Sequence, residues 1–151
     1  MTTRATRLAL VYARVALGTA FLSAVAGRFG IWDRSIDWAH FDRFMRRTAE
    51  VNAFMPAFTI PFLAWAATIA EISLGLCLIL GIQLRWTALA SALLLAMFAT
   101  AMTMSLGVKS PLDYSVFSAS AGALLLALRA RDTTFTSQPT PSESPLPPAA
   151  P

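Results

Sequence analysis

The stretch FTIPFLAWAATIAEISLGLCLILGI, residues 58–82, decides the fold because it is a long apolar run with a single charged residue, Glu71. An α-helix rises about 1.5 Å per residue, so roughly 20 residues cross a hydrocarbon core that is about 30 Å thick. Backbone amides surrounded by lipid need partners within their own segment, which favours a helix over irregular structure. We therefore predict that residues 58–82 form a transmembrane helix.

Three further apolar runs repeat this pattern, over residues 8–29, 86–106 and 112–128. The first two are long enough to span a bilayer, and the last is short and is expected to begin in the interfacial region near Asp113. None shows the alternation of apolar and polar residues that a barrel strand requires. The sequence predicts an all-α integral membrane protein, a four-helix bundle within residues 1–131.

The composition supports a membrane protein with one domain. Of the 151 residues, 56% are hydrophobic and 13% are charged, whereas soluble domains carry about 25% charged residues. The net charge of +4 comes mostly from arginines that flank the apolar runs, which suits lipid headgroups and does not predict nucleic-acid binding. Cys77 is the single cysteine and lies in an apolar run, so we expect it to pack as a small apolar residue.

The long connection after the first run has a helical pattern of its own. Its apolar residues recur at spacings of three and four, and its charged residues fall mostly on the other side: Trp38, Phe41, Met45, Thr48 and Val51 are the residues of the apolar side. This pattern predicts an amphipathic helix over residues 37–51 that lies at the membrane surface or over the mouth of the bundle. Residues 132–151 are rich in proline, serine and threonine and are predicted to form a flexible tail.

The N-terminal run has two interpretations. Arg4 and Arg7, the apolar residues after them and the sequence Ala24-Val25-Ala26 resemble a cleavable signal peptide. Arg14 interrupts the apolar core that such a peptide needs, and the run is longer than most signal cores. We therefore favour a retained transmembrane helix.

The distribution of basic residues gives a preference for the topology. With both termini in the cytoplasm, that side carries arginines with almost no acids near them, whereas the acids gather in the long connection. The cytoplasmic side would hold Arg4, Arg7, Arg85, Arg129 and Arg131, and the other side Arg28, Arg34, Arg43, Arg46, Arg47 and Lys109. The two sides thus carry five and six basic residues, which is too small a difference to decide the topology. The uneven placement of acids adds little, because acids contribute weakly to the positive-inside rule. Cytoplasmic termini are the preferred topology.

Two ionisable residues lie at membrane depth and are the first candidate site. Arg14 is about two turns into the first apolar run, and Glu71 is near the middle of the second. A charge at the centre of a spanning helix costs about 2.5–3.5 kcal/mol on insertion scales, so each should face the bundle and find a partner. We predict an Arg14–Glu71 pair, which either only fixes the helix register or forms a polar site for a proton or a ligand headgroup such as a quinone carbonyl.

A second polar cluster is expected at the opposite face, from Arg28, His40, Lys109 and Asp113. Asp113 could pair with Arg28 or Lys109, and helix capping with interfacial charge is the simpler interpretation. No metal or haem is expected, because His40 is the single histidine and Cys77 lies in another region. No phosphate-binding loop or nucleophile motif occurs in the chain.

Several short motifs are similar to those of a known family. The first run reads RVALGTAFLSAVAGRF over residues 14–29, the second reads EISLGLCLILGIQLR over residues 71–85, and SPLD precedes the last run at residues 110–113. In this order they resemble the DoxX family of small four-helix membrane proteins, over residues 7–129. Arg28 stands where that family usually has a lysine, and Pro111 interrupts its Ser-Leu-Asp element.

The resemblance implies a membrane protein associated with redox chemistry. Some members of that family are subunits of a thiosulfate:quinone oxidoreductase, which makes quinone a candidate ligand. We accordingly expect an accessory or quinone-interacting subunit in a bacterial inner membrane, with a soluble oxidoreductase as partner and self-association as a further candidate. A proton-coupled transporter that uses Glu71 and a structural anchor remain the alternatives.

Overall fold

The computed structural model describes residues 4–34 and 36–135, with side chains as far as Ala130. Its elements are α1 (Arg4–Arg28), α2 (Trp38–Val51), the short helix η1 (Ala57–Thr59), α3 (Ile60–Leu80), α4 (Leu84–Leu106), α5 (Lys109–Asp113) and α6 (Val116–Phe135). No strand occurs in this part of the chain. The predicted all-α fold is confirmed.

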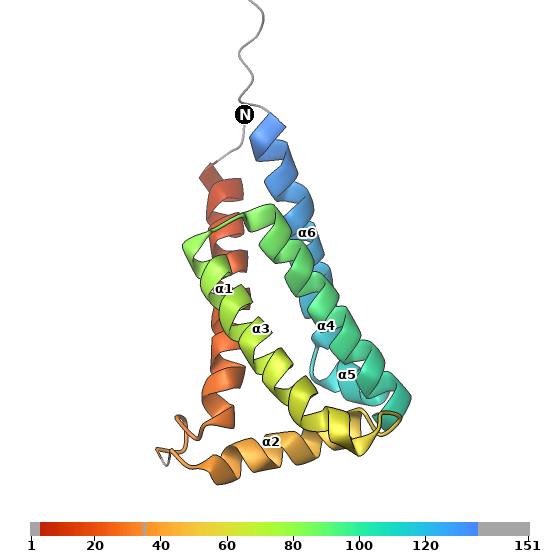
Figure 1. Cartoon of the computed structure of the whole chain (residues 1–151). Coiled ribbons are helices and arrows are strands. Elements are labelled where there is room, and N and C mark those ends of the chain that lie inside the picture. Colours follow the sequence, from red (N-terminus) through yellow and green to blue (C-terminus); the bar gives the residue numbers. More distant parts are fainter. Residues whose placement is uncertain (1–3, 35, 136–151) are drawn as a thin grey trace, which may run out of the picture.

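The four longer helices α1, α3, α4 and α6 form a bundle, and α2 lies across one end of it (Figure 1). The first residues of α1 and the last residues of α6 lie at the opposite end (Figure 1). Within the bundle α1 packs mainly against α3, and α4 packs mainly against α6. The amphipathic helix predicted between the first two apolar runs is therefore present as α2.

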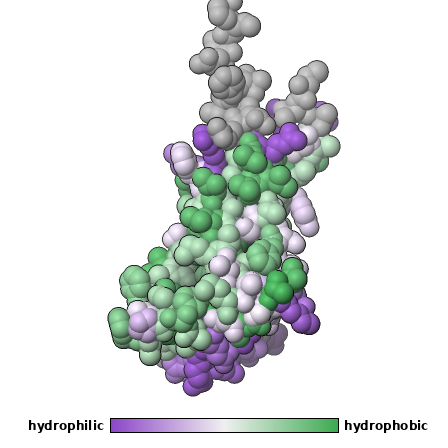
Figure 2. All heavy atoms as spheres, turned by 90° about the vertical axis from the view of Figure 1, so that its right-hand side faces the viewer, coloured by the Kyte–Doolittle hydropathy of each residue, from purple (hydrophilic) through white to green (hydrophobic). Residues whose placement is uncertain are grey.

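Three segments are long and apolar enough to cross a membrane: α1, the continuous segment Ala57–Leu80, and α4. The apolar part of α6, Val116–Ala130, is shorter. Large apolar side chains face outward along these helices, for example Phe62, Leu93 and Leu125, as expected where lipid is the solvent. On the face that Figure 2 shows, the middle of the bundle is mostly apolar, and hydrophilic residues gather at the end that α2 covers.

The last apolar run is divided where a single helix from Leu112 was predicted. Helix α5 ends at Asp113, and Ser115 takes a left-handed backbone conformation with φ 55° before α6 begins. Because an L-residue in that conformation cannot continue a right-handed helix, the chain turns there. Helix α6 also continues to Phe135, past the predicted boundary at residue 132. The rest of the predicted tail, residues 136–151, lies outside the described residues.

Two glycines let the backbones of α1 and α3 cross closely. A Cβ added at Gly18 would lie 2.8 Å from the carbonyl oxygen of Gly75 and 2.7 Å from Cγ1 of Ile79. A Cβ added at Gly75 would lie 3.1 Å from the carbonyl oxygen of Gly18. Small residues at such a crossing permit the close packing that associates helices in lipid.

We expect Gly18→Ala to lower the free energy of unfolding, because the added methyl group has no room beside the Gly75 carbonyl. Overpacking of this kind costs about 1–3 kcal/mol. Gly27→Ala is the matched control, since the nearest atom to its added Cβ is 3.9 Å away. Thermal unfolding in detergent micelles measures both. Equal midpoints for Gly18→Ala and Gly27→Ala would contradict the close crossing.

Candidate functional site

The centre of the site is an ion pair between α1 and α3. Arg28, the last residue of α1, places Nη2 2.6 Å from Oε1 and 2.7 Å from Oε2 of Glu71. The side chains of Arg28 and Glu71 are only 10% and 3% exposed. A guanidinium that bridges both carboxylate oxygens makes strong, charge-assisted hydrogen bonds, which offset the cost of removing the two charges from water.

Thr68 completes the hydrogen bonding of this pair. It lies three residues before Glu71 on α3, and residues at that spacing share one face of a helix. Arg28 Nη1 donates to the Thr68 hydroxyl at 3.0 Å, and that hydroxyl donates to the carbonyl oxygen of Ala64 at 2.8 Å. The buried hydroxyl is thus used as both an acceptor and a donor.

Aromatic residues cover the ion pair from the side of α2. The guanidinium carbon of Arg28 lies 3.9 Å from the ring centroid of Phe44, a cation–π distance. Phe41 is 3% exposed, and its ring centroid is 5.6 Å from that of Phe29 and 4.6 Å from that of Trp65. We refer to Phe29, Trp38, Phe41, Phe44 and Trp65 as the aromatic cap. It attaches α2 to the ends of α1 and α3.

Helix α2 is capped at its two ends by Asp37 and Asn52. The Asp37 carboxylate accepts from the backbone N–H of Ala39, and the backbone and side-chain N–H groups of Asn52 donate to the carbonyl oxygen of Thr48. These are the caps that polar residues provide at helix termini. The face of α2 away from the aromatic cap is polar and exposed: it carries Asp42, Arg43, Arg46, Arg47 and Glu50.

The predicted Arg14–Glu71 pair is wrong, because Glu71 binds Arg28. Arg14 lies instead at the C-terminal end of α3, where its Nη1 is 2.5 Å from the position that a Cβ on Gly81 would occupy. Its Nε is buried and has no hydrogen-bond partner. Side chains on a helix lean toward its N-terminus. Arg28 therefore reaches back into the bundle toward Glu71, and Arg14 leans away from it.

The comparison with protein families identifies the chain. A model of the family described as methylamine utilisation protein MauE matches residues 6–130, which cover the bundle except the first two residues of α1 and the last five of α6. This protein belongs to the MauE family. The predicted membership of the DoxX family is wrong, because the family that matches is MauE. The searches of curated proteins and of solved structures gave no match.

The second predicted cluster is only partly formed in this MauE-family protein. Lys109 and Asp113 pair with each other across one turn of α5, with exposed side chains. His40 lies on α2, with its Nδ1 2.6 Å from Nη2 of Arg43 and 3.5 Å from Oδ2 of Asp33. The structure places Arg28 with Glu71 rather than in this cluster.

The sequence interpretation missed the residues that surround the ion pair, above all Thr68 and Phe44. Their positions carried a signal, since Thr68 shares a helix face with Glu71, and Phe44 follows Phe41 by three residues. Within the described residues no three histidine, cysteine, aspartate or glutamate side chains gather to hold a metal. Cys77 is partly buried and free. The arrangement is suited to joining α1 to α3 and to attaching α2.

A double-mutant cycle tests which arginine pairs with Glu71. We expect Arg28→Met to destabilise the protein strongly, because the loss of one partner from a buried pair costs about 3–5 kcal/mol. Arg28→Met combined with Glu71→Leu should recover much of this loss. Unfolding in mixed detergent measures the coupling free energy.

Arg14→Met provides the matched control for this cycle. Its effect should add to that of Glu71→Leu within about 0.5 kcal/mol, as for residues without a shared contact. Strong coupling of Glu71 to Arg14, and none to Arg28, would contradict the geometry of the site.

Proposed function

We propose that this protein is a membrane accessory protein of a redox system whose reactive groups reside on a soluble partner. The observation that carries the proposal is that the Arg28–Glu71 pair has a structural role. Both charges are occupied in joining α1 and α3 and in fixing the aromatic cap of α2. The link of the MauE family with methylamine utilisation supports a redox setting. A bundle of this kind serves as a scaffold in the membrane.

The proposed docking surface for the partner is the polar outer face of α2. This face is exposed, and the inner face of the same helix is held by Phe41 and Phe44. The bundle end that carries α2 is opposite the termini (Figure 1). With cytoplasmic termini in a bacterial inner membrane, α2 would face the periplasm, and so would the soluble partner. Arg46 is exposed near the middle of this face.

Growth on methylamine tests this proposal. In the native host, deletion of the gene should abolish growth on methylamine and leave growth on succinate unchanged. Arg46→Glu should restore growth poorly, because it reverses a charge on the docking surface without touching the ion pair. Arg85→Glu, a charge reversal on an exposed residue at the other end of the bundle, should restore growth fully. Normal growth of the deletion strain on methylamine would refute the proposal.

Binding of a quinone headgroup at Arg28 is a second candidate function. It is favoured by the setting of the Arg28 guanidinium, which carries more N–H groups than Glu71 and Thr68 use and lies against an aromatic ring. A quinone carbonyl accepts hydrogen bonds, and its ring stacks on aromatic side chains. Displacement of the Phe44 ring would open the site.

Extraction of the purified protein tests this second function. About one quinone per chain should survive purification in mild detergent, and Glu71→Gln should release it because the loss of the carboxylate charge frees Arg28 to move. Arg46→Gln should retain the quinone. Wild-type protein without quinone would end this candidate, and proton-coupled uptake by liposomes that contain the protein would favour a transporter instead.

A further inference from the structure

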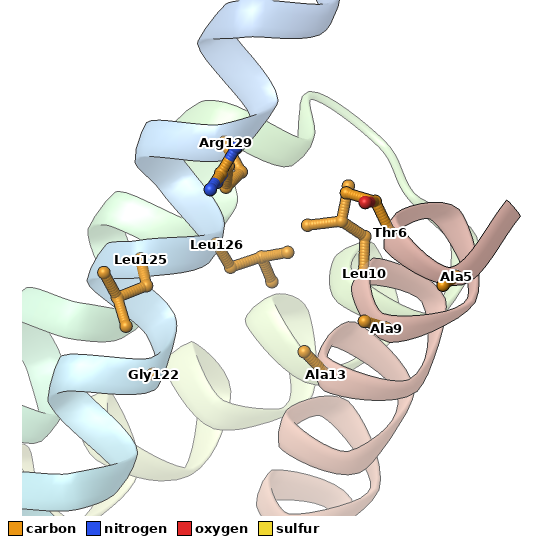
Figure 3. Close-up of a pocket in the computed structure, with 9 residues that line it drawn as sticks. All are labelled: Ala5, Thr6, Ala9, Leu10, Ala13, Gly122, Leu125, Leu126 and Arg129. Carbon is orange, nitrogen blue, oxygen red and sulfur yellow. The ribbon is translucent and has the colours of Figure 1, made fainter. Parts of the chain in front are cut away.

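A groove with a volume of about 550 Å³ runs between the beginning of α1 and the end of α6. Figure 3 shows its two walls, with Ala5, Ala9 and Ala13 on α1 facing Gly122 and Leu126 on α6. Pockets that hold small molecules have volumes of about 300–1,000 Å³. The volume of the groove thus lies in the range of pockets that bind small molecules.

The shape and lining of the groove suit a hydrocarbon chain. The wall on α1 extends from Ala5 to Ala13, which corresponds to about 12 Å at the rise of a helix. Alanines form much of this wall, and Gly122 leaves open space opposite it, since a Cβ added there would meet no atom within 4 Å. Leucines supply the rest of the apolar surface. The groove therefore runs along the helices of the bundle, and the polar residues that line it, Thr6 and Arg129, lie at its outer end.

The outer end of the groove is cationic. Arg129 lies at this end, at the level of Thr6 (Figure 3). The same end of the bundle carries four further arginines, Arg4, Arg7, Arg14 and Arg85. Among the side chains that the structure describes, no acidic side chain lies at this end. Asp132 is the nearest acid in the sequence. An arginine at the membrane surface attracts anionic lipid by about 1 kcal/mol.

We propose that this groove binds one anionic phospholipid, with an acyl chain along the alanines of α1 and the phosphate at Arg129. A second copy of the chain is the competing occupant, since small residues also admit a helix. Two copies in one membrane share the same orientation. A dimer interface at this groove would therefore bring Arg129 of both copies to the same depth in the membrane. Their repulsion at the edge of a low-dielectric medium opposes that dimer and favours a lipid.

Native mass spectrometry tests this inference on the full-length protein in detergent. Phosphatidylglycerol and phosphatidylcholine with identical acyl chains are added in equal amounts, and the lipid retained by each chain is counted. The wild type should retain phosphatidylglycerol in preference, and Arg129→Gln should lower that preference about fivefold. Gly122→Leu, which fills the groove, should lower the retention of both lipids.

Two variants are matched controls. Ala121→Leu adds the same side chain to the neighbouring, exposed position of α6, and Arg46→Gln removes a charge at the other end of the bundle. Both should retain the lipid like the wild type. Equal retention of the two lipids by the wild type would overturn the inference. The inference would also be overturned if the wild type formed a dimer and Gly122→Leu dissociated it. A third contrary outcome is that the Arg129→Gln and Gly122→Leu variants fold and retain lipid as the wild type does.

Discussion

The structure depends on the ion pair of Arg28 and Glu71, in which one guanidinium nitrogen, Nη2, donates to both carboxylate oxygens. A carboxylate within a membrane-spanning helix is costly unless it is paired, and here a guanidinium supplies two hydrogen bonds to it. The same guanidinium binds Thr68 and lies on the Phe44 ring. One side chain at the end of α1 therefore connects the middle of α3 with the apolar face of α2. Removal of that side chain would leave a buried acid and would take from α2 its contact through Phe44.

Side-chain direction decides which charges meet along α1 and α3. Both arginines lean toward the N-terminus of α1, so Arg28 enters the bundle and Arg14 approaches the end of α3 at Gly81. The carbonyl groups at the end of a helix carry partial negative charge, which suits a guanidinium. Between the two arginines the backbones cross at Gly18. The α1–α3 pair is thus held by the ion pair near one end and by the close crossing at Gly18, with Arg14 beside the end of α3.

Hydropathy was sufficient to predict the helices. It did not predict the features that depend on single residues, which are the break in the last apolar run and the partner of Glu71. The apolar runs and the amphipathic segment before residue 52 were sufficient to predict the bundle and α2, because burial in lipid and helical periodicity act over many residues. The break at Ser115 depends on one left-handed residue and leaves no mark on hydropathy. The partner of Glu71 was missed because depth was counted along the helix axis without the lean of the side chains. The DoxX-like motifs were too short to separate one family of small bundles from another.

The free-energy cost of burying two charges supports a role of the ion pair in orienting α2. Apolar residues of similar volume could replace many buried ion pairs with little loss of stability, so stability alone explains this one poorly. A pair that bridges two helices and contacts a third at one ring allows few alternative arrangements of α2. An apolar contact in its place would lack the directional hydrogen bonds that place the guanidinium under the Phe44 ring. With the pair present, the outer face of α2 with Arg46 is held in one orientation, which a soluble partner of the proposed kind requires.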